Sequence, residues 1–168
     1  MKKFELTSET KINIFGKKLF RIKALISFAD VEAGETGGWV EKEGNVNQSG
    51  DAWVYGNAEV SGNAKVYGNA KVSGNAMVSG NAIVYGDAMV SGDAMVSGDA
   101  DYTTIHGFGT QFRTTTFFRC KDKKVRVACG CFFGTIPEFR EQVKNTRKGK
   151  IAEEYLMIAD LMEKHFEK

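Results

Sequence analysis

Histidine and cysteine are both scarce in this chain. The 168 residues include two histidines and three cysteines. His106 and His165 are too few for a zinc site of three imidazoles, so we expect no metal and no other cofactor. Cys129 and Cys131 are separated by one residue, which fits neither paired Cys-x-x-Cys zinc ligands nor, with an odd total, a complete disulfide framework. We therefore expect free thiols in a reducing compartment.

Long apolar runs are also missing. No stretch approaches the about 18 apolar residues that a membrane-spanning helix needs, and the start Met1-Lys2-Lys3 leads into mixed polar sequence rather than into a signal-peptide core. We expect a soluble cytoplasmic protein without a membrane partner.

Glycine, by contrast, is abundant and regular. From Gly50 onward each hexad reads Gly, Asn or Asp, Ala, a variable residue, Val, and Ser or Tyr, up to Val96. Glycine returns at every sixth position over a longer stretch, at Gly38, Gly44, Gly50, Gly56, Gly62, Gly68, Gly74, Gly80, Gly86, Gly92 and Gly98.

Each hexad predicts one short strand and one corner. Ala and Val lie two residues apart, so in an extended segment they point to the same side while the residue between them points outward. The Gly-Asn or Gly-Asp pair that follows tolerates left-handed backbone and allows a sharp bend. A single hexad cannot bury its Ala and Val, so the hexads must stack as a solenoid.

This pattern resembles the hexapeptide-repeat family of left-handed parallel β-helices. The resemblance rests on an aliphatic residue followed four positions later by a small one, as in Val54 and Ala58. The resemblance implies a triangular prism in which residues eighteen apart stack, and very often a homotrimer. The expected fold class is therefore mainly β: a β-hairpin cap in 1–37, the left-handed β-helix in 38–102, and a small α+β segment in 103–168. The family includes acyltransferases, carbonic-anhydrase-like enzymes and binding or scaffolding proteins, so the fold does not select a function.

The flanking segments carry their own local signals. A hairpin across Gly16 should cap the first coil. After the repeat we expect a loop at 103–110 and strands at 115–119 and 125–131, joined by a turn at Asp122-Lys123. The capping-box pattern from Thr135 to Glu138 predicts a helix to about residue 144, and a second helix is expected at 151–166.

Several stretches outside the hexads resemble small hexapeptide-repeat proteins encoded by bacteriophages and prophages. They read FRIKAL, DVEAGETGGWV, RTTTFFR, CGCFFGT, EFREQV and EYLMIADLMEKHF. The resemblance implies that the protein works in the cytoplasm of a host cell.

Apolar residues occupy several outward positions of the later hexads. Stacking at eighteen residues places Trp53, Lys71 and Met89 in one outward column. The apolar outward set predicts a subunit interface, because exposed apolar patches usually mark contacts. Its members are Met77, Ile83, Met89 and Met95. The alternative is that the C-terminal segment covers them within one chain.

Basic residues cluster after the repeat, with eleven lysines and arginines against three acidic residues in 113–150. Hydroxyls and guanidinium groups can grip a phosphate, and an aromatic ring beside them can stack on a base. The expected ligand-binding residues are Arg113, Thr114, Thr115, Phe117, Arg119 and Lys121. The alternative is that the threonines only form a strand and the basic residues a solvated rim. The modest total charge and the acidic repeat favour a small anionic ligand over nucleic acid.

These observations lead to one hypothesis and two alternatives. The leading hypothesis is a non-enzymatic phage-type protein that sequesters a small phosphate-bearing, nucleotide-like ligand and so counters host antiviral signalling. The first alternative is an acyl-CoA-dependent acyltransferase, for which His106 is the candidate general base. No inserted loop interrupts the hexads to shape an acceptor site, which weighs against that alternative. The second is a structural or scaffold component of a phage.

Overall fold

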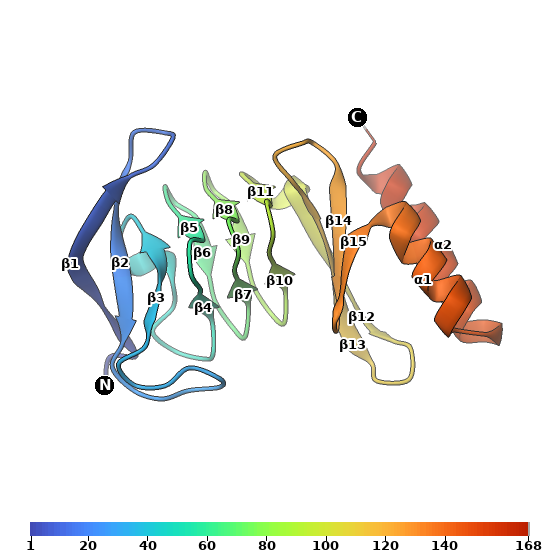
Figure 1. Cartoon of the computed structure of the whole chain (residues 1–168), viewed down its shortest axis with the longest axis horizontal. Helices are drawn as coiled ribbons and strands as arrows, with labels where there is room; N and C mark the ends of the chain where they lie inside the picture. Colours follow the sequence, from blue (N-terminus) through green and yellow to red (C-terminus); the bar gives the residue numbers. More distant parts are fainter. Residues whose placement is uncertain (168) are drawn as a thin grey trace.

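The computed structural model describes residues 1–167, and its parts follow one another along the long axis in sequence order (Figure 1). An antiparallel hairpin stands at the N-terminal end, short parallel strands form stacked coils in the middle, and a second antiparallel sheet leads to two helices at the C-terminal end. The chain is therefore a capped β-solenoid.

The repeat forms the expected parallel coils. Val54 pairs with Val72 and Val72 with Val90, so residues eighteen apart stack as predicted. The coils have three faces, built from β3–β5–β8–β11, β4–β7–β10 and β6–β9. The repeat strands are β4 (Trp53–Val54), β5 (Glu59–Val60), β6 (Lys65–Val66), β7 (Lys71–Val72), β8 (Met77–Val78), β9 (Ile83–Val84), β10 (Met89–Val90) and β11 (Met95–Val96).

Alanine and valine fill the interior of the coils. Each such residue at a repeat position from Ala52 to Val96 is at most 1% exposed. The first coil departs from the pattern, because Val40 pairs with Val60 and Val46 bridges to Val66, twenty residues apart rather than eighteen. A 3-10 turn at Glu43–Asn45 lies within this coil. The two extra residues lie further on, because Val46 to Val54 spans eight residues whereas their partners Val66 to Val72 span six. The regular glycine spacing therefore hides a shift of register.

The N-terminal hairpin caps the first coil as predicted. β1 (Phe4–Ile12) and β2 (Lys18–Ala24) pair antiparallel around Gly16, and β2 continues onto β3 (Thr36–Val40), the first strand of the solenoid. Trp53 occupies an outward position but is fully buried, because the rings of Phe4 and Phe28 pack edge-on against it at 5.8 and 5.3 Å.

Beyond a second 3-10 turn at Asp99–Asp101, the C-terminal sheet contains two strands that the sequence analysis did not predict. Its strands are β12 (Tyr102–Phe108), β13 (Arg113–Arg119), β14 (Val125–Cys129) and β15 (Phe132–Thr135), all antiparallel. The expected loop at 103–110 was wrong: Thr103, Thr104 and Ile105 pair with β13, and a register shift before Phe108 accommodates His106 and Gly107. Three β-branched residues in a row favour a strand despite the glycines that follow.

Both faces of this sheet are covered. Phe118 and Ala128 join the core of the solenoid, whereas Phe117 and Val127 join a second core under the helices. The helices are α1 (Ile136–Thr146) and α2 (Gly149–His165).

The helix start predicted from the capping box is confirmed. The Thr135 hydroxyl accepts a hydrogen bond from the Glu138 amide at 3.3 Å, and the Glu138 carboxylate accepts one from the Thr135 amide at 2.7 Å. Neither helix, within residues 1–167, is long and apolar enough to cross a bilayer.

The outward apolar set does not form one exposed patch. Met77 and Met95 belong to one face of the coils, Ile83 to the second and Met89 to the third. Met77 is only 5% exposed, so the expectation that it lines a subunit interface was wrong. Ile83 and Met95 are half-buried, and Met89 is 38% exposed while its amide donates to the Thr116 hydroxyl.

Candidate functional site

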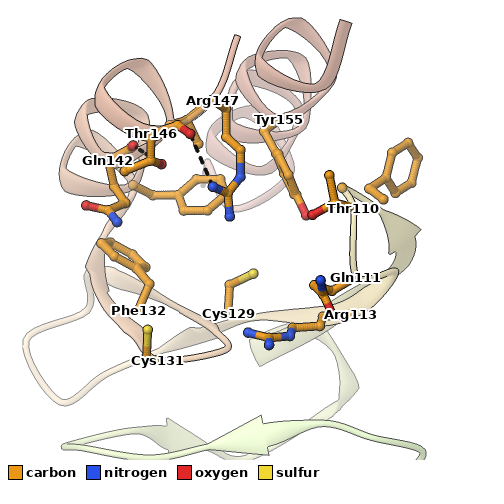
Figure 2. A pocket seen from close by; sticks show the side chains of 14 residues that line it. Thr110, Gln111, Arg113, Cys129, Cys131, Phe132, Gln142, Thr146, Arg147 and Tyr155 are labelled. Atoms are coloured by element: carbon orange, nitrogen blue, oxygen red, sulfur yellow. Dashed lines mark hydrogen bonds between the residues drawn. The ribbon is translucent and has the colours of Figure 1, made fainter.

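Two arginines face one pocket beneath the C-terminal helices. Arg113 stands at the start of β13, and Arg147 follows the last residue of α1 (Figure 2). The pocket holds about 110 Å³ between these residues, the turn that joins β12 to β13, and the turn that joins β14 to β15. Two turns of the sheet and both helices therefore build it.

Local backbone geometry explains how each guanidinium reaches the pocket. Gly130 has a φ of 59°, and a side chain there would collide with the Arg113 guanidinium, so glycine leaves room for that group. Arg147 ends α1 in an extended conformation, with φ −126° and ψ 154°. Its Nη1 donates to the Thr146 carbonyl oxygen at 3.2 Å, which holds the side chain back over the helix end (Figure 2).

Neutral polar groups and aromatic rings complete the walls. Gln111, Gln142 and Thr110 supply side-chain donors and acceptors, and Phe108, Phe132 and Phe139 supply apolar surface. The lining contains two arginines and no aspartate or glutamate. Within residues 1–167, neither arginine forms an ion pair with a carboxylate. The pocket is therefore a positively charged cavity that suits an anion.

Tyr155 brings α2 to the same pocket. Its ring packs edge-on against Phe139 at 5.8 Å and an interplanar angle of 90°. Burial raises the pKa of the Tyr155 phenol, with a further increase from Cys129 and opposing effects from Arg147 and Arg113. The hydroxyl therefore stays protonated at neutral pH and can donate a hydrogen bond.

Arg113 lies in this pocket, but its predicted neighbours on β13 do not line it. Strand alternation directs Thr115 and Phe117 to the side of Arg113, as predicted, but the helices cover that side. Phe117 is fully buried against Phe139, with ring centroids 6.1 Å apart, so its expected role of stacking on a base was wrong. Thr115 is 2% exposed, and its hydroxyl donates to the Cys129 sulfur at 3.1 Å.

Arg119 lies at the opposite end of β13, about 20 Å from Arg113 at the usual strand rise. Its Nε is 3.4 Å from an Asp101 carboxylate oxygen, and its Nη2 donates to the Phe166 carbonyl oxygen at 2.9 Å. Lys121, two residues after Arg119, is exposed. The expectation of one site that joins Arg113 to Arg119 and Lys121 was therefore wrong, because β13 extends between them.

His106 and Thr114 lie side by side on the exposed part of the sheet. The His106 Nδ1 is 3.0 Å from the Thr114 hydroxyl oxygen, and neither residue lines the arginine pocket. Within residues 1–167, no group of three or more His, Cys, Asp and Glu side chains could hold a metal ion.

Six polar residues that line the pocket were not predicted from the sequence: Thr110, Gln111, Gln142, Thr146, Arg147 and Tyr155. Arg147 was counted in the basic cluster, but no local pattern relates it to Arg113, thirty-four residues earlier. The packing of α1 and α2 against the sheet brings them together.

Comparison with known proteins bears on the solenoid alone. No curated protein matches the chain. A family model described as YdcK Beta solenoid repeat matches residues 70–86, which include β7, β8 and β9. Over that stretch the chain is similar to a β-solenoid repeat, in agreement with its stacked parallel coils.

Proposed function

We propose that the protein is a non-enzymatic binding protein that holds a small phosphate-bearing, nucleotide-like ligand between Arg113 and Arg147. The observation that carries this proposal is the pairing of two arginines in a pocket without a carboxylate. Arginine forks match phosphate oxygens in pairs.

The size of the pocket limits which part of the ligand enters. A space of about 110 Å³ accommodates a phosphoryl group but not a whole nucleotide. The phosphate therefore binds between the arginines, and the rest of the ligand extends toward the opening. The half-buried rings of Phe108 and Phe132 supply surface on which a base can stack.

The biological role follows from the phage-type resemblance. A phage protein that binds a nucleotide signal without consuming it lowers the free concentration of that signal. We propose that the protein counters host antiviral signalling in this way, in the host cytoplasm and as a homotrimer. Native mass spectrometry measures the assembly, and a monomer at micromolar concentration would overturn the trimer.

Calorimetric titration with AMP and with inorganic phosphate tests the arginine pocket. Arg113→Ala and Arg147→Ala should each weaken AMP binding about tenfold or more, because a hydrogen bond to a charged group contributes about 1.5–3 kcal/mol. Lys121→Ala is the matched control, since it removes the same charge from an exposed residue outside the pocket. Equal losses in all three variants would show that the effect depends only on net charge, and the proposed site would then be wrong.

The two alternative functions predict different outcomes. An acyltransferase would retain CoA and lose turnover in His106→Ala, although His106 does not line the arginine pocket. A scaffold would bind neither AMP nor CoA. Native mass spectrometry after incubation with a nucleotide-rich lysate separates the three outcomes by the mass of the retained molecule.

A further inference from the structure

A second pocket, opposite in charge to the first, lies beside β9 and the start of β12. It holds about 540 Å³, and its walls include Tyr67, Tyr85, Tyr102 and Asp99, together with Ile83 and two threonines. No lysine or arginine lines it. A carboxylate among phenol rings repels a phosphate and attracts a cation, so this pocket serves a different ligand from the arginine pocket.

The two tyrosines on the solenoid corner form a stack that ends in this pocket. Tyr67 and Tyr85 occupy equivalent positions in successive coils, with ring centroids 5.4 Å apart and planes inclined by 13°. The residue eighteen positions after Tyr85 is Thr103, in β12, so no third tyrosine continues the stack. Tyr85 consequently remains 54% exposed, and its electron-rich ring is open to a ligand.

A hydrogen bond positions the Asp99 carboxylate and leaves its negative charge available to a ligand. One of its carboxylate oxygens accepts a hydrogen bond from the Ile83 amide at 3.0 Å. Within residues 1–167, no lysine or arginine forms an ion pair with Asp99. The pocket therefore contains a positioned negative charge beside an exposed aromatic ring.

Another corner of the same solenoid shows what this combination binds. The Lys71 ammonium lies 5.8 Å from the centroid of the Tyr55 ring and 2.8 Å from a carboxylate oxygen of Asp30. The Tyr55 hydroxyl donates to that same oxygen at 2.9 Å. A tyrosine and an aspartate here hold an ammonium group supplied by the chain.

The second pocket lacks the corresponding chain-supplied cation. Lys71 follows Tyr55 by sixteen residues, and the residue that follows Tyr67 by the same interval is Ile83. An apolar side chain thus stands where the other corner has an ammonium. Ile83 and the tyrosine rings favour a cation with alkyl groups over a small hydrated metal ion, because such a cation loses less hydration when it enters.

We infer that the Tyr67–Tyr85–Asp99 pocket binds an organic ammonium cation. This site is separate from the proposed phosphate site and does not depend on it. The cation is either a free amine of the choline type or a lysine side chain of another protein, and both present an alkylated ammonium group to the tyrosine rings.

Calorimetric titration of the full chain with choline and with 3,3-dimethyl-1-butanol tests whether binding requires the positive charge of the ligand. The alcohol has the shape of choline without its charge, so choline should bind and the alcohol should bind at least tenfold more weakly. A parallel titration with Nα-acetyl-lysine amide identifies the source, since a preference for it over choline indicates a protein partner. If the alcohol binds as well as choline, or if neither cation binds, the inference is overturned.

Three variants locate the binding. Tyr85→Leu should weaken choline binding about three- to thirtyfold, in line with the strength of a cation–π contact. Asp99→Asn should weaken it while the amide oxygen still accepts the hydrogen bond from Ile83. Asp93→Asn is the matched control, because it removes the same charge from the same repeat position outside the pocket. Wild-type affinity in both Tyr85→Leu and Asp99→Asn would place the cation elsewhere and overturn the site.

Discussion

The Tyr102 hydroxyl donates a hydrogen bond of 2.5 Å to the Ile83 carbonyl oxygen. Ile83 lies on β9, which pairs with β6 and with no strand of a later coil among residues 1–167. In the preceding coil the Lys65 amide donates to the Ala82 carbonyl oxygen of the next coil. At the end of the stack, side chains replace the backbone groups that a further coil would supply. Asp99 accepts a hydrogen bond from the Ile83 amide, and Tyr102 donates one to the Ile83 carbonyl. The open edge is thus closed without another strand.

Tyr102→Phe should lower the free energy of unfolding by about 1 kcal/mol, because it leaves the Ile83 carbonyl without its side-chain donor. Tyr102 is 7% exposed, so water replaces that donor poorly. Urea denaturation followed by circular dichroism measures the change. Tyr85→Phe is the control, since its exposed ring loses a hydroxyl at the surface, and an equal loss in both variants would contradict this role of Tyr102.

Gly80→Ala should destabilise the solenoid more than Gly86→Ala. Both glycines have positive φ, 61° and 65°, so alanine strains the backbone at either site by about 1–2 kcal/mol. A methyl group at position 80 would also collide with the Ser97 carbonyl oxygen of the next coil, whereas the space at position 86 is empty. Thermal unfolding of the two variants gives the comparison, and equal losses would show that the coils separate to accept the methyl group.

The regular part of the fold was predictable because its causes are local. Val54 and Ala58 repeat at fixed intervals, and such intervals determine which side chains point inward. The helix that begins after Thr135 was likewise signalled by a hydrogen-bonding pattern within four residues. Glycine spacing was a weaker guide, because Gly44 keeps the six-residue interval although it lies in the 3-10 turn of the longer first coil.

The candidate site was only partly predictable, because it depends on packing between distant segments. Alternation along β13 correctly separated the sides of Thr115 and Thr116, but it could not show that both sides are buried. Likewise, the basic cluster contained Arg113 and Arg147 but gave no sign that α1 ends above the start of β13. The sequence shows which residues are basic, but the packing of the helices on the sheet determines which of them line the same pocket.

The cysteines should differ in their reactivity toward iodoacetamide. Cys131 is exposed, while Cys120 is 5% exposed and burial raises its thiol pKa to about 11. Since the thiolate is the reactive form, Cys131 should be alkylated well before Cys120 at pH 8. Peptide mass spectrometry over time measures the order, and all three thiols should react in urea. Equal rates in the folded protein would mean that the C-terminal sheet opens readily from the last coil.

Lys3 should make the stability of the protein depend on pH above neutrality. Its side chain is 2% exposed, and its Nζ donates to the Ala52 carbonyl oxygen at 2.7 Å and to the Gly50 carbonyl oxygen at 3.1 Å. Burial lowers the Lys3 pKa from 10.5 to about 8, against a smaller opposing effect of Asp51. Between these two pKa values the unfolded chain binds more protons than the folded one. The contribution of Lys3 to the free energy of unfolding therefore rises with pH across that window.

Urea denaturation of the wild type and of Lys3→Met at pH values from 7 to 11 measures this contribution. Other groups titrate over the same range, so the informative quantity is the difference between the two unfolding free energies. That difference should be constant below the folded pKa, should increase in favour of the wild type as lysine loses its proton, and should level off above the unfolded pKa. Lys23→Met is the control, because it removes the same charge from an exposed side chain of the same hairpin. Parallel profiles for Lys3→Met and the wild type would mean that the Lys3 ammonium keeps its water in the folded protein, and that the N-terminal hairpin covers the first coil less tightly than its buried contacts indicate.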